Sequence, residues 1–262
     1  MKIATWNVNS LKARLPHLLR WLGEQNPDIV ALQETKTQDA DFPVAEINAA
    51  GYQVVYNGQK TYNGVATLSR KQGDVLCRAL PNHDDEQRRL LTTRHGCLHV
   101  VNVYVPNGAA VASEKYIYKL EWLLRLRDYL DELMRKGASI IVLGDFNIAP
   151  EDRDVHDPEL WKGQVLVSEP EREQLQSLQS LGLRDCFRLF EQPAGVYSWW
   201  DYRAGAFRRN IGLRIDLILA DVMAAGWCRS CAVDAAPRKW ERPSDHAPVI
   251  AEFTLPPGTA SQ

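Results

Sequence analysis

The chain has 262 residues, of which 45% are hydrophobic and 24% are charged, and its formal net charge is −2. This composition is typical of one large α/β domain or two small ones, and it lacks the global basic field of many nucleic-acid-binding modules. No apolar run approaches the ~20 residues of a membrane span, and the N-terminus lacks the basic-then-apolar layout of a signal peptide. We therefore expect a cytoplasmic protein with no membrane partner.

The first 36 residues predict a strand, a helix and a second strand. Residues 2–6 read as a strand that runs into Asn7 and Asn9, and Ser10 is expected to cap a helix with apolar residues at the helical period. Pro16 falls inside that pattern, so we expect a kink or a restart there. A buried strand at 29–32 is followed by Glu34. Each of these strands thus leads into polar side chains.

The middle of the chain alternates between strands and polar loops. Strands are predicted at 51–56, 64–68, 90–91 and 99–105, and the longest helix at 116–135. Lys60 and Tyr62 lie in a polar loop, and a charge run at 84–89 includes Arg88. Such a run is usually a solvated face, but the apolar strand that follows leaves open that the arginines are aimed at a ligand.

The segment 140–147 carries the clearest chemical signal. Its four apolar residues predict a strand buried on both faces, after which Gly144 lets the backbone turn. Asp145 and Asn147 are two residues apart, so they can point the same way from an extended chain. A carboxylate and an amide there suit the activation of a water and the stabilisation of an anion. An Asx turn that closes the strand is an equal alternative for this segment alone.

The C-terminal part is predicted as a long loop at 150–170, a helix at 170–181 and buried strands at 215–219 and 249–253. Four aromatic residues lie within 197–202, and an arginine cluster follows them. Cys228 and Cys231 form a CxxC, but no second pair completes a zinc site, so we interpret the thiols as structural or incidental. We find no linker and no repeat, and therefore predict a single domain at 1–255 and a disordered tail at 256–262.

Polar residues that follow or interrupt the predicted strands form the candidate site: Asn7, Asn9, Glu34, Tyr104, Asn107, Asp145, Asn147, Asp216, Asp245 and His246. Strand ends on one side of a sheet form one surface, where sites gather. Asp216 lies among apolar residues and must be paired, and His246 is its natural partner.

Converging carboxylates repel one another by ~4 kcal/mol when two charges lie about 4 Å apart at an effective dielectric near 20. A hard divalent cation removes this repulsion, and Mg²⁺ is commonly held by one or two carboxylates. The pattern therefore indicates Mg²⁺-assisted hydrolysis of a phosphate ester.

Seven motifs carry a resemblance to a known family. They are Trp-Asn-Val-Asn at 6–9, Leu-Gln-Glu-Thr-Lys at 32–36, Tyr-Asn-Gly-Val-Ala at 62–66, Tyr-Val-Pro-Asn-Gly at 104–108, Gly-Asp-Phe-Asn at 144–147, Leu-Arg-Ile-Asp at 213–216 and Ser-Asp-His-Ala-Pro at 244–248. With them the chain resembles the exonuclease III family of the endonuclease/exonuclease/phosphatase superfamily. Its members are abasic-site endonucleases and 3′-end-processing DNA repair enzymes.

The resemblance implies a four-layer α/β sandwich with two mixed β-sheets packed face to face and helices outside. It also implies a monomer that uses Mg²⁺ or Mn²⁺ and cleaves double-stranded DNA 5′ to abasic sites, with 3′-end cleaning and 3′→5′ exonuclease activity. Abasic sites and blocked 3′ ends would be its substrates.

The resemblance assigns roles in four groups. Catalytic roles go to Asp145, Asn147, Tyr104, His246, Asp216 and Asn7, and the metal site to Glu34, Asn9 and Asp245. DNA contacts are expected from Asn107, Arg88, Arg203, Arg208, Arg209, Lys60 and Tyr62. An apolar pocket for a base-free sugar is expected from Trp199, Trp200 and Leu213, although any single Trp is more often part of the core.

Two alternatives remain open. The first is a phosphoesterase of the same superfamily that acts on RNA, lipid or inositol phosphates, and the second is a non-catalytic nucleic-acid-binding relative. The aromatic and arginine-rich segment favours DNA over the first alternative. The second would have no need to keep Glu34, Asp145, Asp216 and His246 together.

Overall fold

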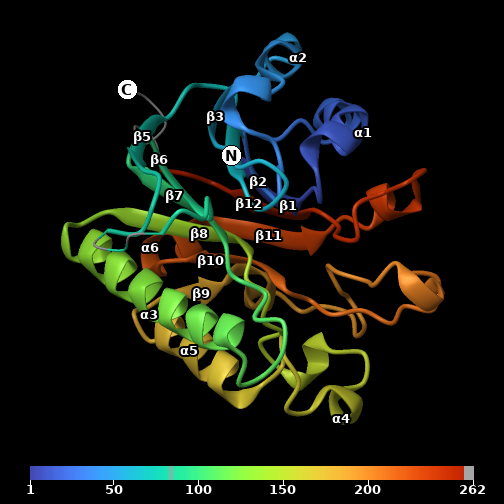
Figure 1. Cartoon of the computed structure of the whole chain (residues 1–262). Coiled ribbons are helices and arrows are strands. Elements are labelled where there is room, and N and C mark those ends of the chain that lie inside the picture. The colour runs from blue at the N-terminus through green and yellow to red at the C-terminus, as the bar shows by residue number, and fades with distance from the viewer. Residues whose placement is uncertain (82, 84, 257–262) are drawn as a thin grey trace.

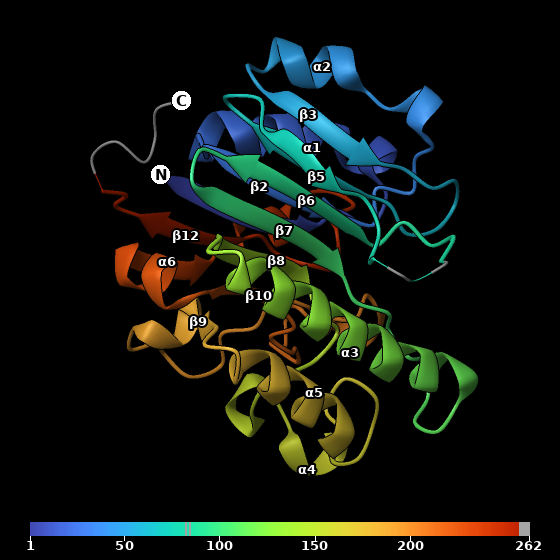
Figure 2. The same ribbon diagram turned by 90° about the vertical axis from the view of Figure 1, so that its left-hand side faces the viewer.

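The computed structural model describes residues 1–81, 83 and 85–256. Within them the chain forms two six-stranded mixed sheets that pack face to face with helices outside (Figures 1 and 2), which confirms the predicted four-layer sandwich. Apart from Pro256, the tail predicted to be disordered lies outside the described residues, as does Asp84 of the charge run. No helix in the described part of the chain is long and apolar enough to cross a membrane.

Each sheet is built around one parallel pair of strands. The first sheet contains, in spatial order, β11 (Cys228–Val233), β12 (Val249–Phe253), β1 (Lys2–Asn7), β2 (Ile29–Gln33), β4 (Val65–Ser69) and β3 (Gln53–Asn57). The second contains β5 (Asp74–Cys77), β6 (Leu90–His95), β7 (Leu98–Tyr104), β8 (Ser139–Asp145), β10 (Asp216–Ala220) and β9 (Arg184–Asp185). β1 and β2 are parallel, as are β7 and β8, while the other neighbours are antiparallel. The pairing of β1 with β12 ties the two ends of the chain into one sheet.

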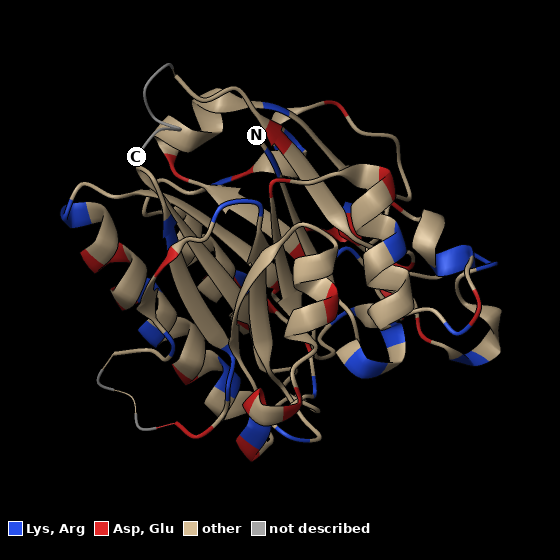
Figure 3. Ribbon diagram, turned by 90° about the horizontal axis from the view of Figure 1, so that it is seen from above, with Lys and Arg blue, Asp and Glu red and all other residues tan. Residues whose placement is uncertain are grey.

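The helices cover the outer faces of the two sheets (Figure 1). α1 (Leu11–Gln25) and α2 (Val44–Ala49) pack on the first sheet, and α3 (Glu114–Arg135) and α5 (Glu169–Gln179) on the second. α4 (Pro158–Trp161) lies within the segment predicted as a long loop, and α6 (Val222–Trp227) precedes β11. Viewed from above, Lys and Arg positions are interspersed with Asp and Glu over the helices (Figure 3), in keeping with the small net charge.

The start of α1 differs from the prediction in two respects. The helix does not restart at Pro16 but is continuous from Leu11 to Gln25, and its buried residues Leu18 and Leu22 belong to the core cluster of the first sheet. Ser10 makes no side-chain cap. Its amide instead donates to the carbonyl of Glu34 at 2.8 Å, and the Leu11 amide donates to that of Thr35 at 2.9 Å. The turn that carries Glu34 therefore caps the helix.

The interface between the sheets changes from apolar to polar along the strands. Ile3 of β1 lies in an apolar cluster between the sheets. Further along, Gln33 Nε2 donates to Asn102 Oδ1 at 2.8 Å, and both side chains are fully buried. At the carboxyl end of β1, Asn7 Nδ2 donates across the interface to Asp145 Oδ2 at 2.9 Å. The candidate site thus lies where the two sheets exchange polar contacts.

We expected the backbone to turn at Gly144. In the structure Gly144 is instead part of β8. Its φ of 151° is unusual for other residues, and a Cβ at this position would lie 1.8 Å from the carbonyl oxygen of Val103. Only glycine therefore permits this close approach of β7 and β8 immediately before Asp145.

Candidate active site

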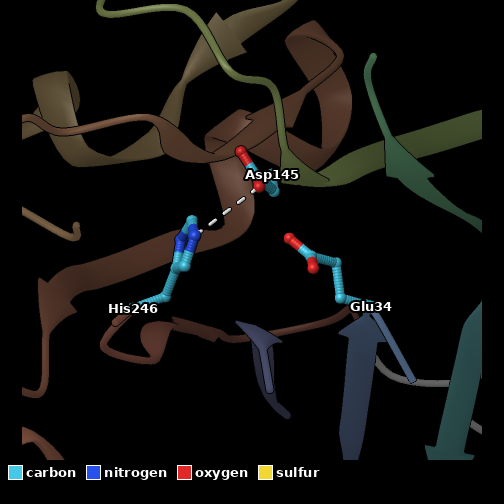
Figure 4. Close-up of side chains that lie close together, drawn as sticks. All are labelled: Glu34, Asp145 and His246. Carbon is cyan, nitrogen blue, oxygen red and sulfur yellow. Dashed lines mark ion pairs between the residues drawn. The ribbon is translucent and has the colours of Figure 1, made fainter. Parts of the chain in front are cut away.

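Two carboxylates of the second sheet face one imidazole. Asp145 of β8 and Asp216 of β10 are directly opposed in the antiparallel ladder, so their side chains leave the same face of the sheet. His246 Nδ1 lies 2.9 Å from Asp216 Oδ2, a hydrogen bond. His246 Nε2 lies 3.8 Å from Asp145 Oδ2 (Figure 4), which is too long for a hydrogen bond. The imidazole is therefore anchored on one side and available on the other.

The anchor itself is rigid. Ser198 Oγ donates to Asp216 Oδ2 at 2.6 Å and accepts the backbone amides of Ile215 and Asp216, each at 3.0 Å. Because Asp216 and Ser198 are completely buried, neither side chain can exchange its partner for water. The orientation of the imidazole is thus set by the fold.

The buried charges shift the pKa values of this group. Burial alone would lower the pKa of His246, but the carboxylates of Asp216 and Asp145 outweigh burial and raise it to about 10. His246 is therefore an imidazolium at neutral pH, with a proton on each ring nitrogen. Burial also raises the pKa of Asp145 to about 7, in spite of the nearby His246. Asp145 can therefore gain or lose a proton near neutral pH, as a general base requires.

Glu34 lies on the other side of Asp145 and comes from the first sheet. It follows β2 with a left-handed φ of 50°. Asn7 Nδ2 donates to its Oε1 at 2.8 Å, and Lys36 Nζ lies 2.9 Å from its Oε2. Tyr104 borders the same carboxylate, and burial together with Glu34 and Asp145 raises the pKa of its phenol well above the usual value. Tyr104 therefore remains a hydrogen-bond donor.

The residues fit a hard divalent cation. Ligand atoms of Glu34, Asp145 and His246 lie within 4.8 Å of one another. His246 is an imidazolium and so offers no lone pair, which leaves carboxylate oxygens from Glu34 and Asp145 as donors. Oxygen donors in this number are typical of Mg²⁺ or Mn²⁺ rather than of softer metals.

Asn9 and Asp245, which we predicted to join Glu34 at the metal, are hydrogen-bonded to protein groups beside it. The two oxygens of Asp245 accept from Asn9 Nδ2 at 2.9 Å and from Trp199 Nε1 at 3.1 Å. Asn9 Oδ1 accepts from Lys36 Nζ at 2.6 Å, so Lys36 bridges Asn9 and Glu34. Asn9 and Asp245 thus lie beside the Glu34 group and are already engaged with protein donors.

Two asparagines complete the site next to Asp145. The amide nitrogen of Asn147 donates to Asp145 Oδ1 at 2.9 Å, and its side chain donates to the carbonyl of Val105 at 3.0 Å. Asn107 Nδ2 donates to Asn147 Oδ1 at 3.0 Å. The exits of β7 and β8 are therefore joined through side chains.

Residues 4–246 match the sequence model of the endonuclease/exonuclease/phosphatase family. The chain belongs to this family. It is 38% identical to exodeoxyribonuclease III of Haemophilus influenzae over 97% of this chain and 100% of that protein, and 33% identical to an exodeoxyribonuclease of Bacillus subtilis over 95% and 98%.

Solved structures of family members show the same architecture. A Neisseria 3′ phosphatase bound to a product DNA hairpin is 44% identical, with a TM-score of 0.95 over 97% of this chain and 100% of that one. An AP endonuclease from Archaeoglobus fulgidus is 38% identical, with a TM-score of 0.93 and the same two coverages.

The predicted DNA contacts fall into two groups beside the site formed by Glu34, Asp145 and His246. Tyr62 and Asn107 line a groove of about 510 Å³ that also borders Tyr104, with the exposed Lys60 and Arg88 next to it. The second group follows Trp200 along the chain and contains the exposed residues Arg203, Arg208 and Arg209. Arg203 already pairs with Asp201 at 2.5 Å.

The three residues predicted to form the apolar pocket do not share one surface. Trp199 is partly exposed and reaches Asp245, whereas Leu213 is completely buried behind it. Trp200 is 3% exposed, packs edge-on against Phe207 with ring centroids 5.1 Å apart, and donates to Asn210 at 3.1 Å. Trp200 therefore belongs to a separate core cluster, and only Trp199 presents a surface to the site.

Three residues that contact the predicted site residues were absent from our prediction: Lys36, Ser198 and Lys119. Lys36 stands two residues after Glu34, so the Glu-Thr-Lys run could have indicated it. Ser198 lies within the aromatic segment 197–202, but nothing local marks this serine as the partner of the Asp216 carboxylate. Lys119 Nζ donates to the backbone carbonyls of Asn107 and Asn147. In the sequence this lysine is expected on the polar side of a helix.

Proposed function

We propose that this chain is a DNA repair nuclease that uses a divalent cation to hydrolyse the duplex phosphodiester 5′ to an abasic site. The same site would trim blocked 3′ ends and degrade duplex DNA from the 3′ end. One observation carries this proposal: Asp145 faces the imidazolium that Asp216 anchors, with Glu34 alongside. The names of the relatives, exodeoxyribonuclease III, AP endonuclease and 3′ phosphatase, support it.

Glu34 would hold the cation, and the Asp145 carboxylate borders the same space. When bound, the cation supplies neutralisation of the phosphate and of the leaving oxygen. Lys36 and Asn7 fix the Glu34 carboxylate from the protein side. Asn9 and Asp245 would contribute by holding Lys36 and Trp199 in place.

Asp145 would accept the proton of the attacking water. Asn7 Nδ2 and the Asn147 amide occupy one lone pair on each Asp145 oxygen, so the carboxylate is aimed but still has free lone pairs. The water oxygen forms the new bond to phosphorus, and the bond from phosphorus to the 3′ oxygen breaks. Incision beside an abasic site thus leaves a 3′ hydroxyl and a 5′ sugar phosphate, and the 3′ oxygen takes its proton from solvent.

His246 would stabilise the negative charge that develops on the non-bridging oxygens of the phosphate. Its Nε2–H is not bonded to Asp145, so it can donate to a non-bridging oxygen placed between them. The protonated phenol of Tyr104 is a second donor on the same side. Fixed donors aimed at developing charge are commonly the largest contribution to catalysis.

Recognition of damage would rest on Trp199 and on the two groups of predicted DNA contacts. A sugar without a base is the least costly unit to swing out of a duplex, because no stacking is lost. The exposed Arg203, Arg208 and Arg209 would neutralise flanking phosphates without reading sequence. One chain supplies every residue named here, so we propose that a monomer is active.

The proposal is tested with a duplex that carries one abasic-site analogue, in Mg²⁺ and in EDTA. We expect a single nick 5′ to the lesion in Mg²⁺, with a 3′ hydroxyl that a polymerase extends, and no nick in EDTA. A duplex with a 3′ phosphate and an RNA duplex of the same sequence are assayed in parallel. Equal cleavage of the RNA would favour the general phosphoesterase, and intact DNA in all metals would favour a non-catalytic relative.

A further inference from the structure

Lys119 is a fully buried cation that touches both asparagines of the site. It lies on α3, is 0% exposed, and its Nζ donates to the carbonyl oxygens of Asn147 at 2.6 Å and Asn107 at 3.2 Å. Its third partner is the equally buried carboxylate of Glu171 on α5. A lysine is almost never fully buried unless it is paired, so this position has a specific requirement for a charge.

We propose that Lys119 is a positioning residue, which sets the geometry of Asp145 through the two asparagines; this rests on the nuclease function proposed above. The ammonium binds the backbone of Asn147, and the amide of the same residue donates to Asp145 Oδ1 at 2.9 Å. The Asn107 side chain closes the arrangement by donating to Asn147 Oδ1. One cation therefore fixes the exits of β7 and β8 relative to each other.

Glu171 extends the same network to the segment before α5. Its Oε1 accepts the Leu166 amide at 3.0 Å, and its Oε2 accepts the Ser168 amide at 3.1 Å. Leu166 has a φ of 77°, which is rare for this residue type, and its carbonyl accepts the Ala149 amide at 2.7 Å. The ion pair thus holds the segment that is hydrogen-bonded to Ala149, shortly after the end of β8.

The neighbouring glycine shows that the backbone is fitted to the lysine. Gly108 has a φ of 93°, and a Cβ there would lie 3.2 Å from Lys119 Cδ and 3.1 Å from Val165. The turn after Asn107 therefore lies directly on the aliphatic part of the lysine.

Stability alone is a poor explanation for this pair. A buried ion pair usually stabilises a protein no better than apolar residues of the same shape, because desolvation offsets the attraction. The pair is, however, well placed to define one arrangement of three backbone segments around Asp145. A positional role predicts that activity changes more than stability when both charges are removed together.

The test is the double variant Lys119→Met/Glu171→Gln, which keeps the side-chain volume and leaves no unpaired buried charge. Tyr129→Phe is the matched control, because Tyr129 lies on the same helix and its buried hydroxyl donates to Thr92 at 2.8 Å, in the body of the second sheet. Single-turnover cleavage of the abasic duplex and its Kd in EDTA are measured below the melting temperature of each variant.

We expect the double variant to lose roughly 10- to 100-fold in the cleavage rate, which is within the usual effect of misplacing a catalytic group, while Kd changes by less than about threefold. Tyr129→Phe should lower Tm and leave the rate unchanged. Lys119→Arg keeps the charge but moves the donors, and should fall between the wild type and the double variant. A folded double variant that cleaves at the wild-type rate would overturn the proposal, and so would a loss in Tyr129→Phe of the same size.

If the double variant does not fold, Lys119→Arg decides: a folded protein with unchanged rate and Kd overturns the proposal, and a selective loss of rate supports it.

A second readout does not depend on nuclease activity. The side-chain amide NMR signals of Asn107 and Asn147 in the metal-free protein should shift in the double variant and in Lys119→Arg, but not in Tyr129→Phe. If the wild type cleaves no DNA but the signals still shift in the variants, the nuclease function is refuted and the positional role is kept. Unshifted signals would refute the positional role.

Discussion

Asp145 and Asp216 stand opposite each other in the β8–β10 ladder, yet only Asp216 is hydrogen-bonded to the imidazole that lies between them. The two carboxylates therefore have different tasks. Asp216 is completely buried and orients and charges His246, while Asp145 keeps free lone pairs toward the water and the phosphate.

The first prediction concerns the pair of His246 and Asp216. Each of His246→Gln and Asp216→Asn should reduce the single-turnover rate by about 10²- to 10⁴-fold, as for loss of a positioned acid–base group. The double variant should be little worse than either single variant, because the two residues act as one unit. Abasic-duplex cleavage by all four proteins measures the coupling. If the losses in rate of the two single variants multiply in the double variant, the contact between His246 and Asp216 has no role in the reaction.

Much of this site was predicted from the sequence, because polar residues at the ends of buried strands are a local pattern. Asn7, Glu34 and Asp145 follow from it, and the structure brings them together through Asn7. Trp200 was predicted for the apolar pocket, but it lies in a core cluster, and the reason is physical. Neighbouring residues in an extended segment point to opposite sides, so Trp199 and Trp200 cannot both face the site.

Lys119 and Ser198 could not have been predicted in the same way. A lysine on a helix reads as surface, and its burial depends on α3, α5 and two strand exits that meet only in the folded chain. Ser198 contacts Asp216 at the start of β10, which lies 18 residues later in the chain. Contacts between distant segments leave no periodic signal.

The second prediction is that a divalent cation stabilises the folded protein. Ligands that bind only the native state raise stability with their concentration, so millimolar Mg²⁺ should raise Tm. Glu34→Gln should reduce that rise. Glu24→Gln is the control, because Glu24 pairs with Arg20 on the exposed side of α1. Calorimetry in Mg²⁺ and in EDTA makes the comparison, and identical Tm values for the wild type in both would argue against a metal at Glu34.

The third prediction separates the two tryptophans. Trp199→Phe removes the bond to Asp245 and should reduce abasic cleavage more than digestion of an undamaged recessed 3′ end. Trp200→Ala leaves a cavity in the core and should cost about 3–5 kcal/mol of stability. Both activities of Trp200→Ala should fall together, in step with the folded fraction. A selective loss of abasic cleavage in Trp200→Ala, with Tm unchanged, would return that residue to the damage pocket.

The fourth prediction concerns the exposed arginines after Trp200. Each phosphate contact contributes about 0.9 to the slope of log Kobs against log salt for duplex DNA. Arg208→Gln/Arg209→Gln should therefore lower that slope by up to about 2 and weaken abasic and undamaged duplexes alike. Arg135→Gln, at the far end of α3, is the control. An unchanged slope in the Arg208/Arg209 variant would exclude both residues from the DNA path.

The fifth prediction concerns stability against pH. Burial lowers the pKa of His95 from 6.5 to about 4, so between these values the unfolded chain binds more protons than the folded chain. The resulting stability is present above pH 6.5 and is lost as the pH falls toward 4. At pH 5 the loss should be about 2 kcal/mol relative to pH 8. Urea unfolding of the wild type and His95→Gln at both pH values isolates this residue, and parallel losses in the two proteins would assign it to other groups.

The most direct test of the central claim is Asp145→Asn, which keeps the size of the side chain and removes the base. With an abasic duplex and saturating Mg²⁺, we predict a single-turnover rate lower by about 10²- to 10⁴-fold, with Kd for the duplex within about threefold of the wild type. Cleavage by Asp145→Asn at the wild-type rate would contradict the assignment of Asp145 as the group that accepts the proton of the attacking water.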